Sequence, residues 1–366
     1  MPRRQPPRVF IVDDEPERAT LRFIKGAELT VLHPEDLENQ HIVEADLMLV
    51  DQHLSRWEER DRNSLACRPL DGLALSSVIR SHVRKEKRDP PAAIALLSAQ
   101  LEDLTAGDEP TRHHLIARTF GLEWVFDKSD ENEAQIVSLG RAVGSIQKLI
   151  EDDTDEYDHL SVGLGLEPSE WFDIAQEDIA NSRPPLHSVS KWTGGMAILR
   201  WLLHQVLPYP TFLWDRHQLA IRLGVSTDWL SEELDGESSE LRSVLEQFRY
   251  NGPLSDFLGD RWWGSGVNHH LWLNTIGHDS LQDPLQEWLS SMCAEVDRRL
   301  GVFVATLSDN LDQNQDLSPV DECVRIRPDG WPSFAAPAWA RVDEIHDSEA
   351  LRSMVDPNDK ASLDDR

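Results

Sequence analysis

The chain has 366 residues, enough for two or three domains, and a formal net charge of −30 with a pI near 4.7. This acidity argues against binding to nucleic acid or an anionic membrane, because contacts to phosphate need clustered lysine and arginine. No apolar stretch approaches the ~20 residues of a membrane span, and the N-terminus lacks the apolar region of a secretory signal. The cysteines are far apart and form no CxxC pair, which indicates reduced thiols in a cytoplasmic protein (Cys67, Cys293 and Cys323).

The first 150 residues alternate between strand and helix patterns, which predicts an α/β fold with a parallel sheet. Short apolar runs that suit buried strands lie within residues 8–14, 28–33, 45–52, 92–100 and 122–130. Helical patterns occupy the intervening residues 15–26 and 72–83 and the closing residues 132–150.

The first of these strands, "VFIV", ends in the acidic sequence "DDE", which places Asp13 and Asp14 at its carboxyl end. Ligand sites of open α/β sheets form at that edge. Two adjacent carboxylates repel each other unless a cation lies between them. A divalent cation with oxygen ligands, Mg²⁺, is therefore one prediction. The alternative is an exposed acidic turn that caps the next helix.

Three further strands end in polar side chains that converge on the same edge: Asp51, Ser98 and Lys128. A carboxylate such as Asp51 can act as a nucleophile toward a phosphoryl group. Mg²⁺ would neutralise the transferring oxygens, and Lys128 would supply a mobile positive charge. Ser98 can donate a hydrogen bond to another phosphoryl oxygen. The set predicts formation of an aspartyl phosphate.

Residues 8 to about 150 resemble the receiver domain of two-component response regulators. The resemblance rests on five short motifs in order: "VDDE" (12–15), "LMLVD" (47–51), "PLDG" (69–72), "LLSA" (96–99) and "GLEWVFDK" (121–128). It implies a five-stranded parallel, flavodoxin-like sheet and a histidine kinase as the phosphate donor. It also implies the role of each site residue. Asp13, Asp14, Asp51 and the His53 backbone carbonyl would bind the metal, and Asp51 would also accept the phosphate. Ser98 would be the switch hydroxyl, and Lys128 would be the lysine of the family.

The sequence departs from the receiver pattern at three places. An insertion, "SRWEERDRNSLAC" (55–67), separates Asp51 from the "PLDG" motif. Ser129 follows the lysine, where the family usually has a proline that forms a cis peptide bond. This cis bond is therefore not expected here. Val125 occupies the aromatic switch position, with Trp124 and Phe126 on either side. These departures leave open a pseudo-receiver that keeps the fold but takes no phosphate.

The composition changes after residue 150. Residues 151–164 begin with the charge block "EDDTDEYD" and are predicted to form an acidic linker. Helical spacing separated by proline and glycine then predicts a mainly α-helical second domain of unknown function over residues 165–345. The polar residues 346–366 are predicted to be a mobile acidic tail.

Residues 217–234 have the spacing of a helix-turn-helix, which would make the chain a transcription factor. The would-be recognition helix presents Asp228, Glu232 and Glu233 and no basic residue, so nucleic acid is an unlikely partner. We interpret the segment as an ordinary helix pair.

The second domain also contains three histidines and a tryptophan pair within residues 262–278. His269, His270 and His278 lack the ligand spacing of a metal site. The neighbouring tryptophan pair, Trp262 and Trp263, suits a packed core or a partner-binding surface. We find no Ser-His-Asp order, phosphate loop or HExxH, and therefore predict no output enzyme.

The sequence thus favours a phosphorelay receiver that takes phosphate on Asp51 with Mg²⁺. It would signal or buffer phosphate through contacts with an effector protein or a second copy of itself. A DNA-binding regulator that uses residues 217–234 and a non-phosphorylated scaffold are the alternatives.

Overall fold

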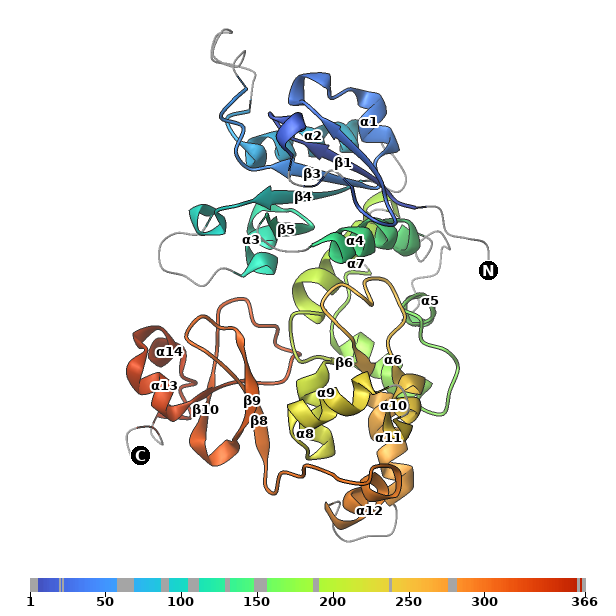
Figure 1. Cartoon of the computed structure of the whole chain (residues 1–366), viewed down its shortest axis with the longest axis vertical. Coiled ribbons are helices and arrows are strands. Elements are labelled where there is room, and N and C mark those ends of the chain that lie inside the picture. The colour runs from blue at the N-terminus through green and yellow to red at the C-terminus, as the bar shows by residue number, and fades with distance from the viewer. Residues whose placement is uncertain are drawn as a thin grey trace. The chain divides into compact units, whose positions relative to one another are not determined.

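The computed structural model describes residues 6–19, 21, 23–57, 69–86, 92–104, 112–128, 132–147, 157–186, 191–236, 239–275, 282–360 and 363 (Figure 1). The chain divides into two compact units. The first comprises residues 1–165, 184–208 and 252–258, and the second comprises residues 166–183, 209–251 and 259–366. Among the described residues, no helix is long and apolar enough to cross a membrane.

The first unit is built on a five-stranded sheet in which every neighbouring pair is parallel, with the order β2-β1-β3-β4-β5. The strands are β1 (Arg8–Val12), β2 (Glu28–Leu32), β3 (Leu47–Asp51), β4 (Ala93–Ser98) and β5 (Trp124–Asp127). Every residue of β3 and β4 is buried, as expected for continuous apolar runs at the centre of a parallel sheet. The predicted flavodoxin-like α/β fold is confirmed.

Helices cover both faces of this sheet (Figure 1). They are α1 (Asn39–Glu44), α2 (Gly72–Glu86), α3 (His113–Phe120) and α4 (Glu133–Gln147). On one face, α2 buries Leu75, Ile79 and Val83, which lie one helical turn apart and belong to the same core cluster as Val50. On the other face, α4 contacts β3 and β4.

The pattern of residues 15–26 predicted a helix between β1 and β2, and that prediction is wrong. Among the described residues of this segment, the only helical element is a 3-10 turn over Pro16–Arg18. The described residues that follow are not helical, although Ala19 and Ile24 are buried. The segment turns at Gly26, whose φ of 92° suits glycine because it has no side chain.

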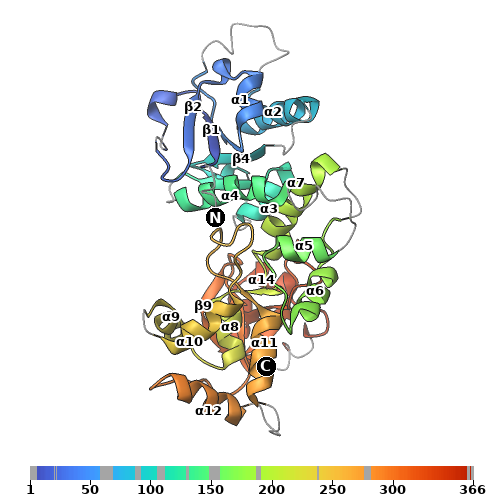
Figure 2. The ribbon, with the colours of Figure 1, turned by 90° about the vertical axis from the view of Figure 1, so that its right-hand side faces the viewer.

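Two segments from later in the chain belong to the first unit. One contains α7 (Lys191–Trp201) and the π-helical residues Leu202–Val206, and it contacts α3 and α4 (Figure 2). The other is residues 252–258, which we call the hook. The Phe257 ring of the hook packs edge-on against Trp124 of β5, with 4.8 Å between centroids.

A fully buried carboxylate, Glu123, fastens α7 to the sheet. Its oxygens accept hydrogen bonds from the backbone N–H of Ile94 (2.6 Å) and from the guanidinium groups of Arg80 (3.3 Å) and Arg200 (2.5–2.8 Å). The Glu123 carbonyl accepts a hydrogen bond from His204 Nε2 at 2.9 Å. One residue therefore joins α2, β4, α7 and the π-helical turn.

The second unit is rich in helices and contains two small sheets. Its helices include α6 (Phe172–Asn181), α8 (Arg216–Leu223), α9 (Thr227–Asp235), α10 (Glu240–Leu245), α11 (Gly264–Thr275) and α12 (Gln282–Met292). The Trp262–Trp263 pair forms the short strand β7, paired with β6 (Leu213–Trp214), and both of its rings are buried. This pair is therefore part of the core.

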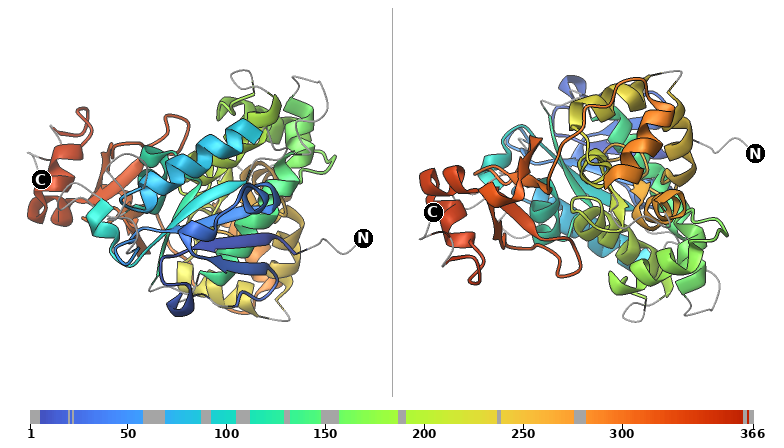
Figure 3. Two further views of the ribbon diagram at one scale, coloured as in Figure 1. Left: turned by 90° about the horizontal axis from the view of Figure 1, so that it is seen from above. Right: turned by 90° about the horizontal axis from the view of Figure 1, so that it is seen from below.

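The second sheet of this unit has four strands in the order β10-β11-β8-β9. They are β8 (Phe303–Leu307), β9 (Gln313–Pro319), β10 (Cys323–Ile326) and β11 (Ala338–Arg341). The short helices α13 (Val342–Asp347) and α14 (Glu349–Met354) follow, and the first of them contacts β11 (red in Figure 3). Residues 346–366 were predicted to form a mobile tail, but in the described part Leu351 is fully buried and Asp359 pairs with Arg325.

Candidate functional site

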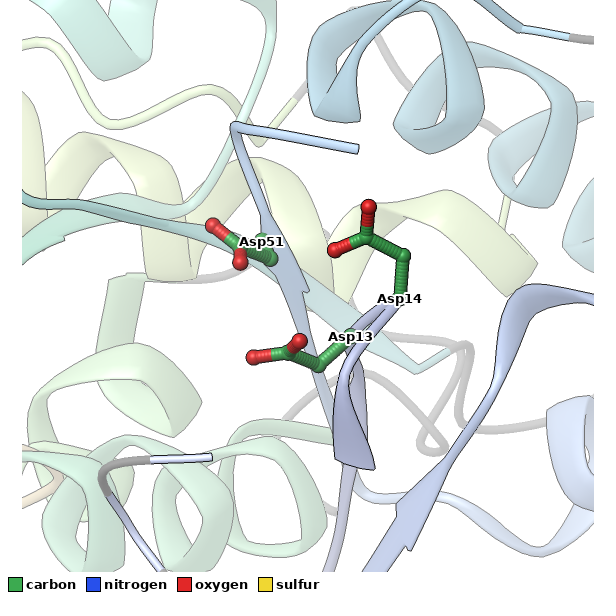
Figure 4. Close-up of side chains that lie close together, drawn as sticks. All are labelled: Asp13, Asp14 and Asp51. Carbon is green, nitrogen blue, oxygen red and sulfur yellow. The ribbon is translucent and has the colours of Figure 1, made fainter. Parts of the chain in front are cut away.

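Three carboxylates meet at the carboxyl edge of the parallel sheet (Figure 4). Asp13 and Asp14 follow β1, and Asp51 ends the neighbouring strand β3. The register pairs Val12 with Val50, so both strands end at the same level. One oxygen from each carboxylate lies within 4.8 Å of the others. The cluster can hold a metal ion.

Burial makes this cluster of negative charge costly. Asp13 and Asp51 are only 6% and 4% exposed. Burial, together with the nearby charge of Asp51, raises the pKa of Asp13, although the Glu15 N–H and Lys128 act in the opposite direction. A cation that replaced the lost water would stabilise the ionised form of all three carboxylates.

Lys128 supplies one positive charge to the cluster. Its Nζ lies 2.8 Å from Asp51 Oδ2 and 3.9 Å from Asp13 Oδ2. Lys128 follows β5, and its backbone N–H donates to the Ser98 carbonyl at 2.8 Å, so the lysine lies beside the end of the neighbouring strand β4. One ammonium against three carboxylates leaves a net charge of −2, and the donors are all hard oxygens. The residues therefore fit a divalent cation such as Mg²⁺.

The other two predicted site residues lie at the same sheet edge. Ser98 ends β4 and is buried, and its Oγ accepts a hydrogen bond from the Gln100 N–H at 3.1 Å. The His53 N–H donates to Asp51 Oδ1 at 3.2 Å, so the turn after β3 bends around the Asp51 carboxylate. All the predicted positions are thus close to the ends of β1, β3, β4 and β5.

The departures from the receiver pattern have different structural outcomes. Val125 is fully buried in the core, and its carbonyl accepts a hydrogen bond from His113 Nδ1 at 2.8 Å. Trp124 and Phe126 both lie near Phe257 of the hook. Ser129 lies outside the described residues, as do residues 58–67 of the insertion.

The described start of the insertion reaches the acidic cluster. The Arg56 N–H donates to Asp14 Oδ2 at 2.5 Å, and its guanidinium pairs with Glu15 Oε1 at 2.6 Å. Neither Arg56 nor Glu15 was predicted to be a site residue. Arg56 lies inside an insertion, where no sequence pattern marks it as a site residue. Glu15 does belong to the acidic "DDE" run, which could have identified it.

Gly72 of the "PLDG" motif lies against the backbone of Asp51. A Cβ at position 72 would be only 2.1 Å from the Asp51 carbonyl oxygen and 2.8 Å from the Gln52 Cα. The Gly72 N–H also donates to the Gln52 carbonyl at 3.0 Å. Only glycine fits this contact, which fixes the turn that carries Asp51.

We expect Gly72→Ala to lower the free energy of unfolding by about 1–3 kcal/mol, because overpacking shifts the backbone. Urea denaturation followed by circular dichroism measures the change. Gly144→Ala is the matched control, since Gly144 lies in α4 with nothing within 4 Å of the added Cβ. That variant should be neutral or slightly stabilising. Equal stabilities of the two variants would contradict the close contact at Asp51.

The histidines of the second unit form no comparable cluster. His269 Nε2 lies 3.2 Å from Glu170 Oε2, and His270 packs against the rings of Phe248 and Trp288. His278 lies outside the described residues. Within the described ranges, the acidic triad is the one group of three or more side chains placed to hold a metal ion.

Comparison with known proteins adds no relative from which a role can be transferred. No protein-family model matches the chain, and neither the curated proteins nor the solved structures contain a significant match. The assignment therefore rests on the sheet topology and on the acidic cluster: the chain contains a flavodoxin-like domain with receiver-like topology and a site that can hold a metal ion.

Proposed function

We propose that this chain is a phosphorelay receiver whose Asp51 accepts a phosphoryl group from a histidine kinase. One observation carries the proposal: Asp51 lies beside two further carboxylates and 2.8 Å from Lys128, at the carboxyl edge of a parallel sheet. A nucleophilic carboxylate, a cation site and a lysine are the groups that phosphoryl transfer to aspartate requires.

The side chains have complementary roles in the proposed transfer. A carboxylate oxygen of Asp51 attacks phosphorus, and the P–N bond of the donor phosphohistidine breaks with its electron pair left on the imidazole. Mg²⁺ bound by Asp13, Asp14, Asp51 and the His53 carbonyl would neutralise the phosphoryl oxygens. Lys128 would supply a positive charge to one phosphoryl oxygen, and Ser98 would donate a hydrogen bond to another.

The output in this proposal is protein contact. Phosphorylation adds about −1.5 to −2 charges beside Lys128 at the end of β5. Two residues of that strand, Trp124 and Phe126, contact Phe257 of the hook. A change in the position of β5 would therefore reach the hook and alter the surface offered to an effector protein or a second copy. A complete switch needs about 5.5 kcal/mol of differential stabilisation.

Intact-mass measurement after incubation with acetyl phosphate and Mg²⁺ tests the proposal. We expect one added phosphoryl group, removed by mild base because an acyl phosphate hydrolyses there. An unmodified mass in the folded wild type would favour the pseudo-receiver scaffold instead.

We expect millimolar Mg²⁺ to raise the melting temperature of the wild type. Binding to the folded state alone stabilises it by about 2.7 kcal/mol when the ion is at 100 times its dissociation constant. Calorimetry with and without Mg²⁺ measures the shift, and Asp14→Ala should lose most of it. Asp36→Ala is the control, since Asp36 is exposed in the turn after β2. An equal shift in all three proteins would count against the site.

We expect no sequence-specific binding to duplex DNA. Helices α8 and α9 do form a helix pair around Gly224, but the exposed residues of α9 include Asp228, Glu232 and Asp235. Like charges on this face would repel DNA phosphates, and phosphorylation would add negative charge. Footprinting at physiological salt, with and without acetyl phosphate, measures this. A specific footprint would support the transcription-factor alternative.

A further inference from the structure

The first unit contains a pocket that is separate from the acidic cluster. It measures about 390 Å³ and is lined by the loop before β2, one side of α4 and the hook. Gly26 lies two residues before β2, and Gly140 of α4 packs against Pro7, just before β1. The pocket therefore lies toward the amino ends of the strands, whereas Asp51 lies at their carboxyl ends.

Two basic residues line this pocket, Lys25 and Arg141. The Arg141 guanidinium lies against Gly26, where an added Cβ would be 3.2 Å from its terminal nitrogen, and Lys25 is the preceding residue. Neither basic group forms an ion pair with a described residue, and this includes Asp256, the one carboxylate in the lining. Within the described residues, these two basic groups have no acidic partner, although the chain has 66 acidic and 36 basic residues. They favour an anion at this place.

The rest of the lining suits a ligand with a polar head and a compact body. Ser138 precedes Arg141 by nearly one turn of α4, so their side chains share a side of the helix. The Ser138 hydroxyl makes no hydrogen bond to a described residue. Val137 and Leu254, both largely buried, supply the apolar part of the wall.

The hook side of the pocket is held in place before any ligand arrives. Gln135 Nε2 donates to the Phe257 carbonyl at 3.0 Å, and the Phe257 ring packs on Trp124. Leu254 adopts a left-handed conformation, φ 65°, which a non-glycine residue keeps only where its surroundings enforce it. A preformed wall lowers the cost of ordering the site on binding.

We propose that this pocket binds a small phosphate ester. An arginine presents a planar fork that matches two phosphate oxygens, and Lys25 adds the point charge that suits a doubly charged head group. The volume falls in the range of about 300–1,000 Å³ that is usual for small-molecule sites. The site does not depend on phosphorylation of Asp51.

Titration calorimetry of the full chain with glycerol 3-phosphate tests this proposal, in EDTA so that no metal bridges the probe to Asp51. We expect saturable binding in the millimolar range or tighter. Arg141→Gln and Lys25→Gln should each weaken it at least about tenfold, the loss of one charged hydrogen-bonding partner. Arg84→Gln, on the exposed side of α2, and Lys128→Ala should leave it unchanged.

Hydrogen exchange provides an independent measurement. Glycerol 3-phosphate should increase protection in α4 and residues 252–258 of the wild type, whereas glycerol and sodium chloride at matched ionic strength should not. The melting curve of each ligand-free variant shows whether it is folded. Absent saturation, or equal weakening by Arg84→Gln and Arg141→Gln, would overturn the proposal.

Discussion

Replacing Glu123 with alanine is expected to lower the free energy of unfolding of the first unit by about 3–5 kcal/mol, the usual result of removing one partner from a buried ion pair. Glu123 is fully buried and accepts hydrogen bonds from Arg80, Arg200 and the Ile94 N–H. Its removal leaves both guanidinium groups without their shared carboxylate and leaves the N–H without its acceptor.

Urea denaturation measures this loss, and hydrogen exchange at the Ile94 amide locates it in the first unit. Glu133→Ala is the control, because Glu133 is exposed at the start of α4 and should change stability by no more than about 0.5 kcal/mol. Arg200→Ala should loosen α7, and its effect should not add to that of Glu123→Ala, since both remove the same contact. Additive losses would mean that Glu123 does not hold α7.

The same carboxylate makes stability depend on pH. Burial alone would raise the pKa of Glu123, but Arg80, Arg200 and the Ile94 N–H together lower it from 4.5 to about 2. A group with a lowered folded pKa stabilises the fold above its unfolded pKa, and that contribution is lost as the pH falls from about 4.5 to about 2.

Two buried histidines act over a higher pH range. Burial lowers the pKa of His204 to about 4 and that of His114 to about 2, against 6.5 when exposed. Their neutral forms stabilise the fold above pH 6.5, and this contribution falls as the pH drops below that value. In Glu123→Gln, the loss of stability below pH 4.5 should become shallower, while the loss between 6.5 and 4.5 should persist. If the loss of stability below pH 4.5 is unchanged in Glu123→Gln, then Glu123 is not the group that titrates in that range.

The sheet of the first unit was predictable because each strand is a short apolar run and parallel strands bring their carboxyl ends together. The site followed from that geometry: once β1, β3, β4 and β5 are neighbours, Asp13, Asp51, Ser98 and Lys128 must lie near one edge. The "PLDG" motif was also identified, but its function was not. That Gly72 packs against the Asp51 carbonyl depends on where the chain returns after the insertion.

Long-range contacts were the part that sequence patterns could not predict. Glu123 lies among apolar residues in "GLEWVFDK" without a local partner, and its partner Arg200 is 77 residues further along. The hook has no periodic pattern that would assign it to β5. In the second unit, β9 reads "QNQDLSP", a mostly polar strand whose pairing with β8 decides its conformation.

Asp51→Asn is expected to abolish phosphorylation of the chain by acetyl phosphate in the presence of Mg²⁺. An amide is nearly the same size as a carboxylate, but it carries no charge and has no nucleophilic oxygen that can form the acyl phosphate. The change also removes the negative partner of Lys128, which lies 2.8 Å from Asp51 Oδ2. Intact mass and base lability measure the label, and circular dichroism shows whether the fold is retained.

The pattern across a small set of variants distinguishes the acceptor from the groups that assist it. Asp14→Ala and Lys128→Ala should slow phosphorylation, but Asp51 should remain the labelled residue. The first variant alters the metal site and the second removes the positive charge beside Asp51, and both leave the nucleophile in place. Excess Mg²⁺ should recover part of the rate in Asp14→Ala, where the site is weakened, and none in Asp51→Asn. Asp36→Asn, exposed in the turn after β2, should label like the wild type. A base-labile phosphoryl group that persists in folded Asp51→Asn would place the acceptor elsewhere, and the other carboxylates of the cluster, Asp13 and Asp14, would then be the first to replace.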